Sequence, residues 1–256
     1  MHVAFLIPDC HIPYHDRKAY ALALKVAKAI HDGEFQNLEL KEIVILGDYA
    51  DFYAVNSHGK HPQMNQLLSE EIDFVNQELN LIDEMFCGVD KTFIFGNHEQ
   101  RLERFVENYC PTLFGLTSCI NLFEFHRRRN WTLCDYGPKQ LHRILGSQLY
   151  ARHEPFSMSS AMASVKKSMI NLVYGHVHRA EEATITGALN SYTNFSVGWL
   201  GDVRKSQVFG YTKTPPNWQL GFGVVYVNPK TRQFSFDKIM IQSDYTCFFA
   251  GRIFEG

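Results

Sequence analysis

Five short apolar runs in this chain each end directly in residues that can bind a metal ion. The runs are residues 3–7, 43–46, 92–95, 148–151 and 171–174, and each is typical of a buried strand. The segments that follow them are Asp9-Cys10-His11, Gly47-Asp48, Gly96-Asn97-His98-Glu99, Arg152-His153 and Gly175-His176-Val177-His178. In open α/β sheets, ligands gather in the crevice beyond the carboxyl ends of the strands. The sequence therefore predicts that these five turns converge on one site.

The apolar spacing between the runs indicates helices. Residues 16–31 and 66–85 place apolar side chains every three or four positions, which gives one buried stripe on a helix. Residues 101–109 continue in the same way, and Pro111 then prevents further extension. Strands that alternate with helices favour an α/β fold in which helices cover a parallel sheet.

From residue 131 onward the pattern changes to short strands. Gly146-Ser147 and residues 228–231 have the composition of turns, and residues 157–167 are expected to be helical. The expected strands are residues 131–135, 141–145, 148–153, 194–197, 222–227 and 233–241. An insert is expected over residues 53–63. The order predicts one domain, residues 1–256, built as a two-sheet β-sandwich flanked by helices.

Composition restricts the classes of function. The 256 residues, 45% of them hydrophobic, suffice for a single large core. A formal net charge of -2 argues against the broad basic surface that non-specific nucleic-acid binding needs, and the run Arg127-Arg128-Arg129 is typical of a solvated face. Six cysteines without a C-x-x-C pair do not indicate a disulfide framework. We expect a cytoplasmic protein without a basic leader or a membrane segment.

In order and spacing, the five motifs resemble those of the calcineurin-like metallophosphoesterases. The resemblance runs from Asp9 through His178 and implies the α/β/β/α architecture of that superfamily. It implies that one divalent metal ion is held by Asp9, His11 and His178. A second would be held by Asn97, His153 and His176, and the carboxylate of Asp48 would bridge the two ions. Ligation by Asp, Asn and His without thiolate suits manganese, which we expect here, and also iron or zinc.

Four further residues have roles implied by the resemblance or by their position. His98 would face the leaving group and donate a proton to it. Asp51 matches the carboxylate that orients this histidine, although a turn or helix-cap acid fits its spacing nearly as well. Arg101 and Arg104 lie one and two turns beyond His98 and can reach a substrate phosphate. The alternative for both arginines is surface pairing with Glu103 or Glu107.

Three positions depart from the superfamily pattern. Phe52 and Phe95 stand where its protein phosphatases carry phosphate-binding arginines, which weakens a phosphoprotein substrate. Glu154 replaces the glycine that usually follows the ligand histidine, so the geometry of His153 is open to change. Residues 96–102 and 217–223 are similar to a small branch found in bacteriophages and bacteria, and a phage-encoded protein would work in the host cytoplasm.

The leading interpretation is a metal-dependent phosphodiesterase acting on a nucleotide or a nucleic-acid end. The alternatives are a phosphomonoesterase and, from another class, a non-catalytic metal-binding scaffold. Aromatic side chains that can stack on a base or pack in the core are Tyr53, Tyr192, Trp199 and Trp218. Ordinary structural or surface positions are assigned to His2, His15, His31, His58, His61, His126 and His142.

Overall fold

The computed structural model describes residues 1–57, 66–208 and 216–256, and it is mixed α/β, as expected. Its larger sheet has the order β11-β10-β1-β2-β3-β4. The neighbours β1 to β4 pair in parallel, whereas β10 is antiparallel to both β1 and β11. The strands are β11 (Phe234–Met240), β10 (Gly221–Val227), β1 (His2–Ile7), β2 (Glu39–Ile45), β3 (Asp90–Ile94) and β4 (Trp131–Cys134).

A second sheet of five strands has the order β5-β6-β7-β9-β8. In sheet order these are β5 (His142–Arg143), β6 (Leu149–Arg152), β7 (Asn171–Tyr174), β9 (Ser191–Val197) and β8 (Ala180–Thr186). The three central strands are parallel to one another, and the edge strands β5 and β8 are antiparallel to their neighbours. A separate hairpin is formed by β12 (Thr246–Phe249) and β13 (Arg252–Glu255).

Alternate side chains of β1 belong to two different cores. Ala4 and Leu6 join a cluster that also contains Ala151 and Val173 from the second sheet, so this cluster is shared by the two sheets. Val3, Phe5 and Ile7 join the larger cluster on the opposite face. A strand that is covered on both faces needs apolar side chains at every position. This explains why residues 3–7 of β1 form a continuous apolar run.

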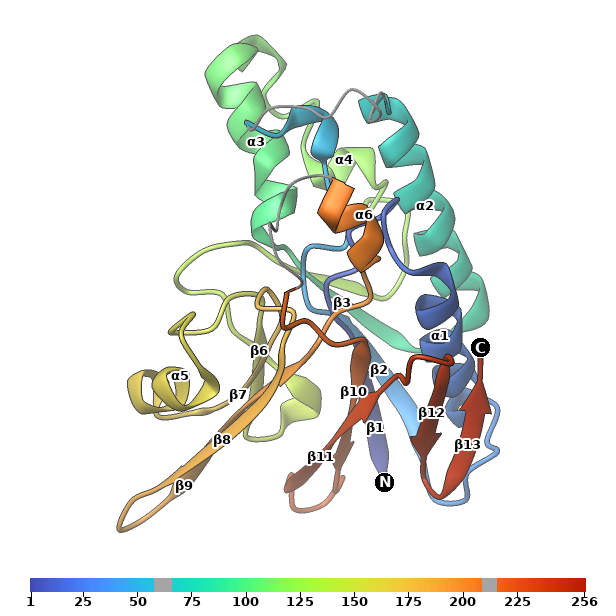
Figure 1. The fold of residues 1–256 in the computed structure, drawn as a ribbon, viewed down its shortest axis with the longest axis vertical. Coiled ribbons are helices and arrows are strands. Elements are labelled where there is room, and N and C mark those ends of the chain that lie inside the picture. The colour runs from blue at the N-terminus through green and yellow to red at the C-terminus, as the bar shows by residue number, and fades with distance from the viewer. Residues whose placement is uncertain (58–65, 209–215) are drawn as a thin grey trace.

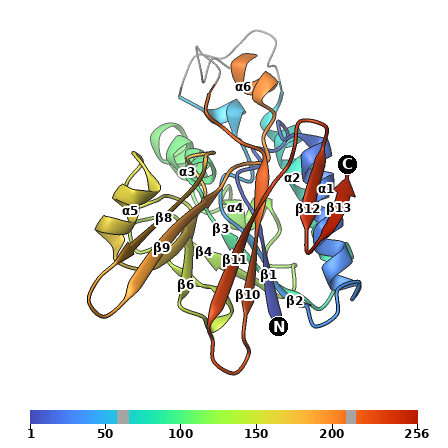
Figure 2. The same cartoon turned by 60° about the horizontal axis from the view of Figure 1, so that its bottom comes forward.

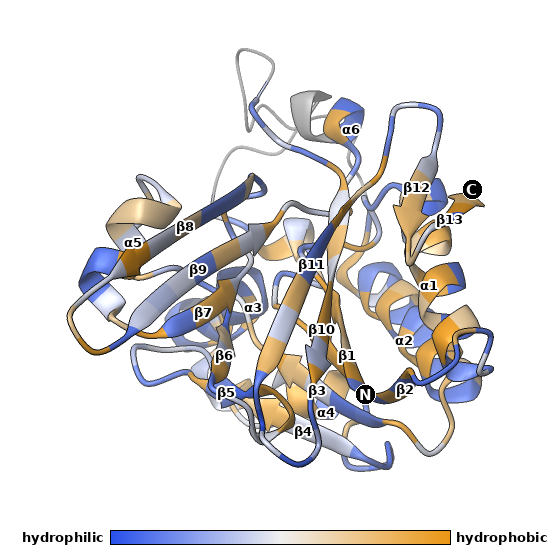
Figure 3. Ribbon diagram, turned by 90° about the horizontal axis from the view of Figure 1, so that it is seen from below, coloured by the Kyte–Doolittle hydropathy of each residue, from blue (hydrophilic) through white to orange (hydrophobic). Residues whose placement is uncertain are grey.

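Helices cover the outer face of each sheet. The larger core takes side chains from α1 (Arg17–His31), α2 (Leu68–Met85) and α3 (Asn97–Tyr109). Figures 1 and 2 show α1 and α2 on one flank of the molecule and α5 (Ala161–Ser168) on the other, against β8 and β9. In Figure 3, α1 has an apolar side and a polar side, as the sequence predicts.

The remaining helices are short. They are α4 (Cys119–Leu122), α6 (Val203–Val208) and the 3-10 turns Tyr53–Val55, Pro111–Leu113 and Ile144–Gly146. Figure 1 shows α3 and α6 at the end of the molecule opposite to the N-terminus, which is where the parallel strands β1 to β3 end. This end of the sheets holds the ligand-bearing turns.

Most predicted elements are confirmed, with changes at their ends. Asp16 caps α1 by accepting hydrogen bonds from Lys18 N and Ala19 N, and α3 begins at Asn97, four residues earlier than expected. The hairpin at Gly146-Ser147 contains a 3-10 turn and shorter strands. The sequence missed β8, β12 and β13. The expected insert starts with the turn Tyr53–Val55, and its later part, with His58 and His61, lies outside the described residues.

The prediction for the basic run, residues 127–129, holds for two of its three arginines. Arg127 and Arg129 are exposed, as predicted. The prediction of a solvated position is wrong for Arg128, which is half-buried. Its guanidinium donates to Asp83 Oδ2 at 2.7 Å and to Asn76 Oδ1 at 3.0 Å, which ties it to α2. A forked donor can hold two acceptors of one helix at once. All six cysteines are free thiols.

Candidate metal centre

Four of the seven predicted ligands have a left-handed backbone conformation. The φ angles are 55° at His11, 47° at Asp48, 67° at His176 and 57° at His178. Non-glycine residues in this region cost about 1–3 kcal/mol each, and they cluster at functional sites. The strand ends therefore turn sharply enough to direct their side chains toward one another.

The first group of donor atoms comes from Asp9, His11 and His178. The Nε2 atoms of the two histidines lie 3.1 Å apart, and His178 Nε2 lies 3.6 Å from Asp9 Oδ1. Asp9 is fully buried, and its Oδ2 has no hydrogen-bond partner within the described part of the chain. Donors bound to one ion by bonds of about 2.1 Å lie roughly 3 Å apart when the bonds meet at right angles. This group therefore fits a metal ion.

The second group comes from Asp48, Asn97, His153 and His176. Oδ1 of Asn97 lies 3.0 Å from His153 Nε2 and 2.8 Å from His176 Nδ1. The two histidine nitrogens are 3.2 Å apart, and His153 Nε2 is 3.2 Å from Asp48 Oδ2. The other nitrogen of His153, Nδ1, lies 2.8 Å from the carbonyl oxygen of Leu46 and can donate to it. That bond leaves Nε2 to act as the ligand.

Asp48 belongs to the second group and also shares a donor set with His11 of the first group. Three sets of side chains can each hold a cation: Asp9 with His11 and His178, His11 with Asp48 and His98, and Asp48 with His153 and His176. Asp48 belongs to the second and third sets, and the second shares His11 with the first. The seven predicted ligands thus fall into neighbouring donor groups that His11 and Asp48 link. The buried groups can hold metal ions.

Buried charges at the centre shift one another's pKa values. Burial alone would raise the pKa of Asp48, but the facing His153 and His98 lower it well below its usual range. Burial would lower the pKa of His153, yet Asp48 raises it to about 10. The buried carboxylate therefore attracts positive charge, which is the property that a cation site needs.

Two glycines allow the ligand turns to pack closely. A Cβ on Gly175 would lie 2.6 Å from Asp9 Oδ2, and a Cβ on Gly96 would lie 2.2 Å from Asp48 Oδ1. Both distances are below van der Waals contact. Any larger residue at either position would displace a predicted ligand.

Glu99 ties two of the turns together, a role that sequence reasoning missed. Its Oε2 accepts hydrogen bonds from Gly96 N at 2.6 Å and from Asp48 N at 3.0 Å, and its Oε1 accepts one from Ala50 N at 2.9 Å. Burial and the charge of Asp48 raise its pKa to about 7. Its place in the first turn of α3, three residues after Gly96, was the signal that could have indicated a capping role.

His98 is not one of the seven predicted ligands, but it shares a donor set with His11 and Asp48. Its Nδ1 lies 2.9 Å from the main-chain oxygen of Asp51 and can donate to it. Its Nε2 lies 2.7 Å from Nη2 of Arg101, which donates to it, and 3.8 Å from Asp48 Oδ2. Burial would lower the pKa of His98, but Asp48 and Asp51 raise it. An imidazole so placed can exchange a proton near the centre.

Asp51 and Arg101 differ in detail from the expectation. The carboxylate of Asp51 lies 3.0 Å from His11 Nδ1 and 3.5 Å from His98 Nδ1. The shorter contact is therefore with His11, a predicted metal ligand, and not with His98. Arg101 Nη1 donates to the main-chain oxygen of Asp51 at 3.2 Å. Arg101 therefore packs inside the site, whereas Arg104 is exposed. Burial and the hydrogen bond to Glu154 raise the pKa of Tyr136, and the charge of Arg104 opposes this rise.

The three departures from the superfamily pattern are accommodated. Phe52 is 1% exposed and stacks on Phe123 at a centroid distance of 5.8 Å, and Phe95 is also buried. Tyr136 donates a hydrogen bond to Glu154 Oε1, so the carboxylate that replaces glycine is held by a phenol. His153 keeps its predicted place beside Asn97 and Asp48.

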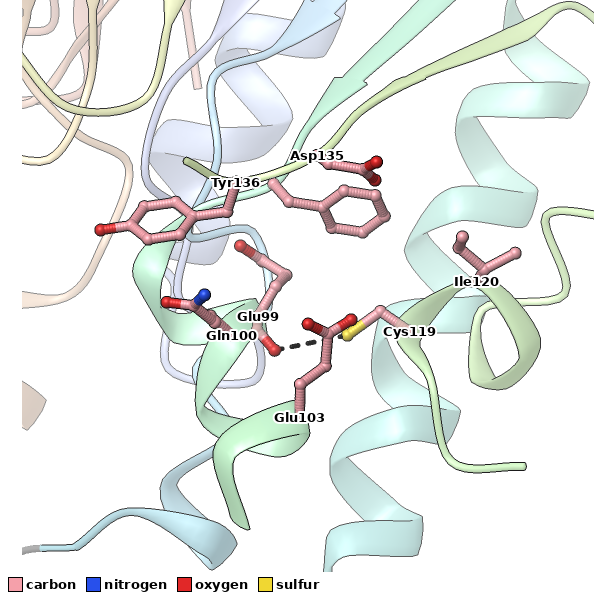
Figure 4. A pocket seen from close by; sticks show the side chains of 8 residues that line it. Glu99, Gln100, Glu103, Cys119, Ile120, Asp135 and Tyr136 are labelled. Carbon is pink, nitrogen blue, oxygen red and sulfur yellow. Dashed lines mark hydrogen bonds between the residues drawn. The ribbon is translucent and has the colours of Figure 1, made fainter. Parts of the chain in front are cut away.

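A pocket of about 330 Å³ lies next to the centre. Glu99, one of the residues that line it, is also the residue that ties the ligand turns together. Figure 4 shows Glu103 pointing into the pocket from α3, with Ile120 opposite and Asp135 and Tyr136 along one edge. The residues that line it are Phe95, Glu99, Gln100, Glu103, Cys119, Ile120, Asp135 and Tyr136. Its lining offers mainly acceptors and aromatic surface.

Two tryptophans pack against the first donor group. The ring of Trp199 stacks on His178 at 4.7 Å, and Trp218 meets His178 edge to face at 4.5 Å. Trp199 is 3% exposed and belongs to the packing, as does Tyr53, whereas Trp218 and Tyr192 are half-buried. Of the aromatic candidates, Trp218 is in ring contact with a predicted ligand and keeps part of its surface exposed.

No protein-family model matches this chain, and no curated protein matches it closely enough to count as a relative. Among the helices of the described residues, none is both long and apolar enough to cross a membrane.

Proposed function

We propose that this protein is a calcineurin-like metallophosphoesterase that hydrolyses a phosphodiester of a nucleotide or a nucleic-acid end. The position of Asp48 between two groups of donor atoms carries the proposal, because a carboxylate there can join two cations. The fold supports it. Two sheets that share one hydrophobic cluster, with helices packed outside them, are compatible with the α/β/β/α sandwich of that superfamily.

Asp9, His11 and His178 would hold one ion, and Asn97, His153 and His176 the other, with Asp48 between them. Manganese is the expected metal, and iron or zinc are the alternatives. Two divalent ions held so would supply a hydroxide nucleophile and polarise the phosphoryl oxygens. The residues around the ions would bind the phosphate and protonate the leaving group.

His98 is proposed to donate a proton to the leaving oxygen. In the structure its Nε2 accepts from Arg101. A substrate phosphate beside Arg101 would take over that guanidinium N–H, since charged oxygens are the stronger acceptors. Nε2 would then be free to bind a proton from solvent, which the charges of Asp48 and Asp51 favour, and to pass it to the ester oxygen, while Nδ1 stays hydrogen-bonded to the Asp51 main-chain oxygen. Arg101 thus links phosphate binding to the release of His98.

A phosphodiester is favoured over a phosphoprotein because Phe52 and Phe95 are packing residues where phosphoprotein phosphatases use arginines. The partly exposed Trp218 beside His178 offers a surface on which a nucleobase can stack. Phosphomonoester hydrolysis is the near alternative, and a metal-binding scaffold without activity is the alternative from another class.

Elemental analysis of manganese-reconstituted protein, combined with rates on a dinucleotide and on nucleoside monophosphates, tests the proposal. We expect two ions per chain and faster turnover of the diester. Asp48→Asn should lose metal and most activity, because it removes the bridging charge. Asp90→Asn, at an exposed aspartate, is the matched control and should keep both. No more than trace metal in the parent would exclude the binuclear centre, and metal without hydrolysis would favour the scaffold.

A further inference from the structure

A second pocket, of about 380 Å³, lies at the start of α1. It is called the α1 pocket below. It is lined by His15, Asp16, Arg17, Lys18, Asp202, Arg204, Lys205 and Tyr245. Its backbone is tied to the metal centre, because Asp16 N donates to Leu200 O at 2.8 Å and Leu200 N donates to Asp9 O at 2.9 Å. The pocket and the Asp9 turn therefore belong to one frame.

The two carboxylates of the α1 pocket are already engaged. Oδ1 of Asp16 caps α1, and its Oδ2 accepts a hydrogen bond from the hydroxyl of Tyr245 at 2.7 Å. Both oxygens of Asp202 accept from the guanidinium of Arg204 at 3.0 Å. Neither carboxylate forms an ion pair within 4.0 Å with the other cations of the pocket in the described chain.

Three cations of the pocket have no carboxylate within 4.0 Å among the residues that the structure describes. Within the described residues, Arg17, Lys18 and Lys205 make no ion pair with a carboxylate, although the whole chain has a net charge of -2. Burial lowers the pKa of Lys205, and Arg17 and Arg204 add to this against the opposing charges of Asp202 and Asp16. Like charges are thus gathered at one place where they repel one another, and a bound anion would offset that repulsion.

His15, set aside as a structural residue in the sequence, lines the same pocket. It is 4% exposed, and its Nδ1 has no hydrogen-bond partner among the residues that the structure describes. Burial and then the charges of Lys205 and Arg17 lower its pKa to about 4. A buried imidazole with one unsatisfied nitrogen at the wall of a cationic pocket is costly unless a ligand or water completes it.

We propose that the α1 pocket binds a phosphate group, at a site separate from the metal centre. Arg17 and Lys205 would supply the charge-assisted hydrogen bonds, and His15 would contact the same anion. The phosphate can belong to the nucleic-acid chain of a substrate or be free phosphate. The site involves none of the predicted metal ligands, so it can exist whether or not the proposed function holds.

Titration of metal-free protein with inorganic phosphate tests this site, because the metal centre then lacks the cations that would bind the probe. The ring signals of His15 are followed by NMR on isotope-labelled histidine and assigned with His15→Gln. We expect a saturable shift in the parent. Arg17→Gln with Lys205→Gln should weaken phosphate binding by about tenfold or more, since two charged contacts are lost. Lys166→Gln with Lys167→Gln removes the same charge from the end of α5 and should leave the affinity unchanged.

A second titration with a short oligothymidylate identifies the source of the phosphate. If the site receives a nucleic-acid phosphate, the pocket double variant should weaken oligonucleotide binding by the same factor. If only inorganic phosphate is affected, the site takes the free anion. A His15 signal that phosphate does not move in the parent would overturn the proposal. So would equal phosphate affinities in the pocket double variant and the α5 double variant.

Discussion

Oδ2 of Asp51 lies 3.0 Å from Nδ1 of His11, so a buried carboxylate fixes the ring of a predicted metal ligand. Burial would raise the pKa of Asp51, but His98 and His11 lower it below its usual range. An ionised carboxylate at Nδ1 keeps the proton on that nitrogen and leaves Nε2 facing His178. Asp51 therefore acts on the first donor group as well as on His98.

Asp51→Asn is expected to weaken the binding of manganese by about 10- to 100-fold, which is the usual effect of losing such an outer partner. The measurement is competition with a chelator for the metal-loaded protein. Asp90→Asn, at an exposed position, should bind metal as the parent does. Unchanged affinity in Asp51→Asn would show that His11 is oriented without it.

Arg101→Lys should raise the KM for a nucleotide diester by about tenfold, because an ammonium group cannot reproduce the planar fork that spans His98 and a phosphate. Steady-state kinetics with manganese measure the effect. Arg127→Lys is the control, since Arg127 pairs with Glu124 on the surface. Equal KM values for the two variants would return Arg101 to a structural role.

His142 offers a test of stability away from the metal centre. Its Nε2 lies 2.6 Å from Glu42 Oε1, which joins the β5 edge of one sheet to β2 of the other. Burial would lower the pKa of His142, but Cys134 and Glu42 raise it from 6.5 to about 9. The folded state thus holds this proton more tightly than the unfolded state. The resulting stabilisation is complete below pH 6.5 and is lost as the pH rises through 9.

We therefore expect the free energy of unfolding to fall by up to about 3 kcal/mol between pH 6 and pH 9.5 because of this pair. Denaturant titrations of metal-free protein measure it, and His142→Gln should lose this part of the pH dependence. His126→Gln, at an exposed position, should follow the parent. A parallel decline in parent and His142→Gln would contradict the prediction.

The predicted ligands could be found from the sequence because each follows an apolar run directly. The backbone alone then brings them to one edge, whatever rotamers the side chains adopt. The partner of Asp51 could not be found in this way. Whether its carboxylate turns to His11 or to His98 depends on side-chain packing within one turn, and spacing along the chain does not encode that choice.

The missed strands and the α1 pocket share another cause. In β8 the exposed and half-buried residues alternate, so that the strand lacks an apolar face that a sequence pattern would reveal. His15 belongs to none of the five motifs, and its cationic neighbours Arg204 and Lys205 lie almost 200 positions later in the sequence. Long-range proximity of this kind follows from the packing of the whole chain.

The role of His98 is tested by the dependence of the rate on the leaving group. If His98 protonates the leaving oxygen, its removal should matter most for a poor leaving group. His98→Asn should slow a nucleotide diester by about 10² to 10⁴ fold and slow a nitrophenyl diester clearly less, because nitrophenolate departs without a proton. His126→Asn is the matched control at an exposed position.

The measurement is the ratio of rates on the two substrates for each protein, which cancels differences in active fraction. Metal content is measured for the same samples. The reason is that His98 N donates to Asp48 Oδ1 at 2.9 Å, so a change at residue 98 that moved the main chain would also move a predicted ligand. A side-chain replacement keeps that main-chain donor, so we expect metal to be retained. Equal losses on both diesters, with metal intact, would leave His98 as a group that positions the phosphate with Arg101 and would assign the proton donor elsewhere.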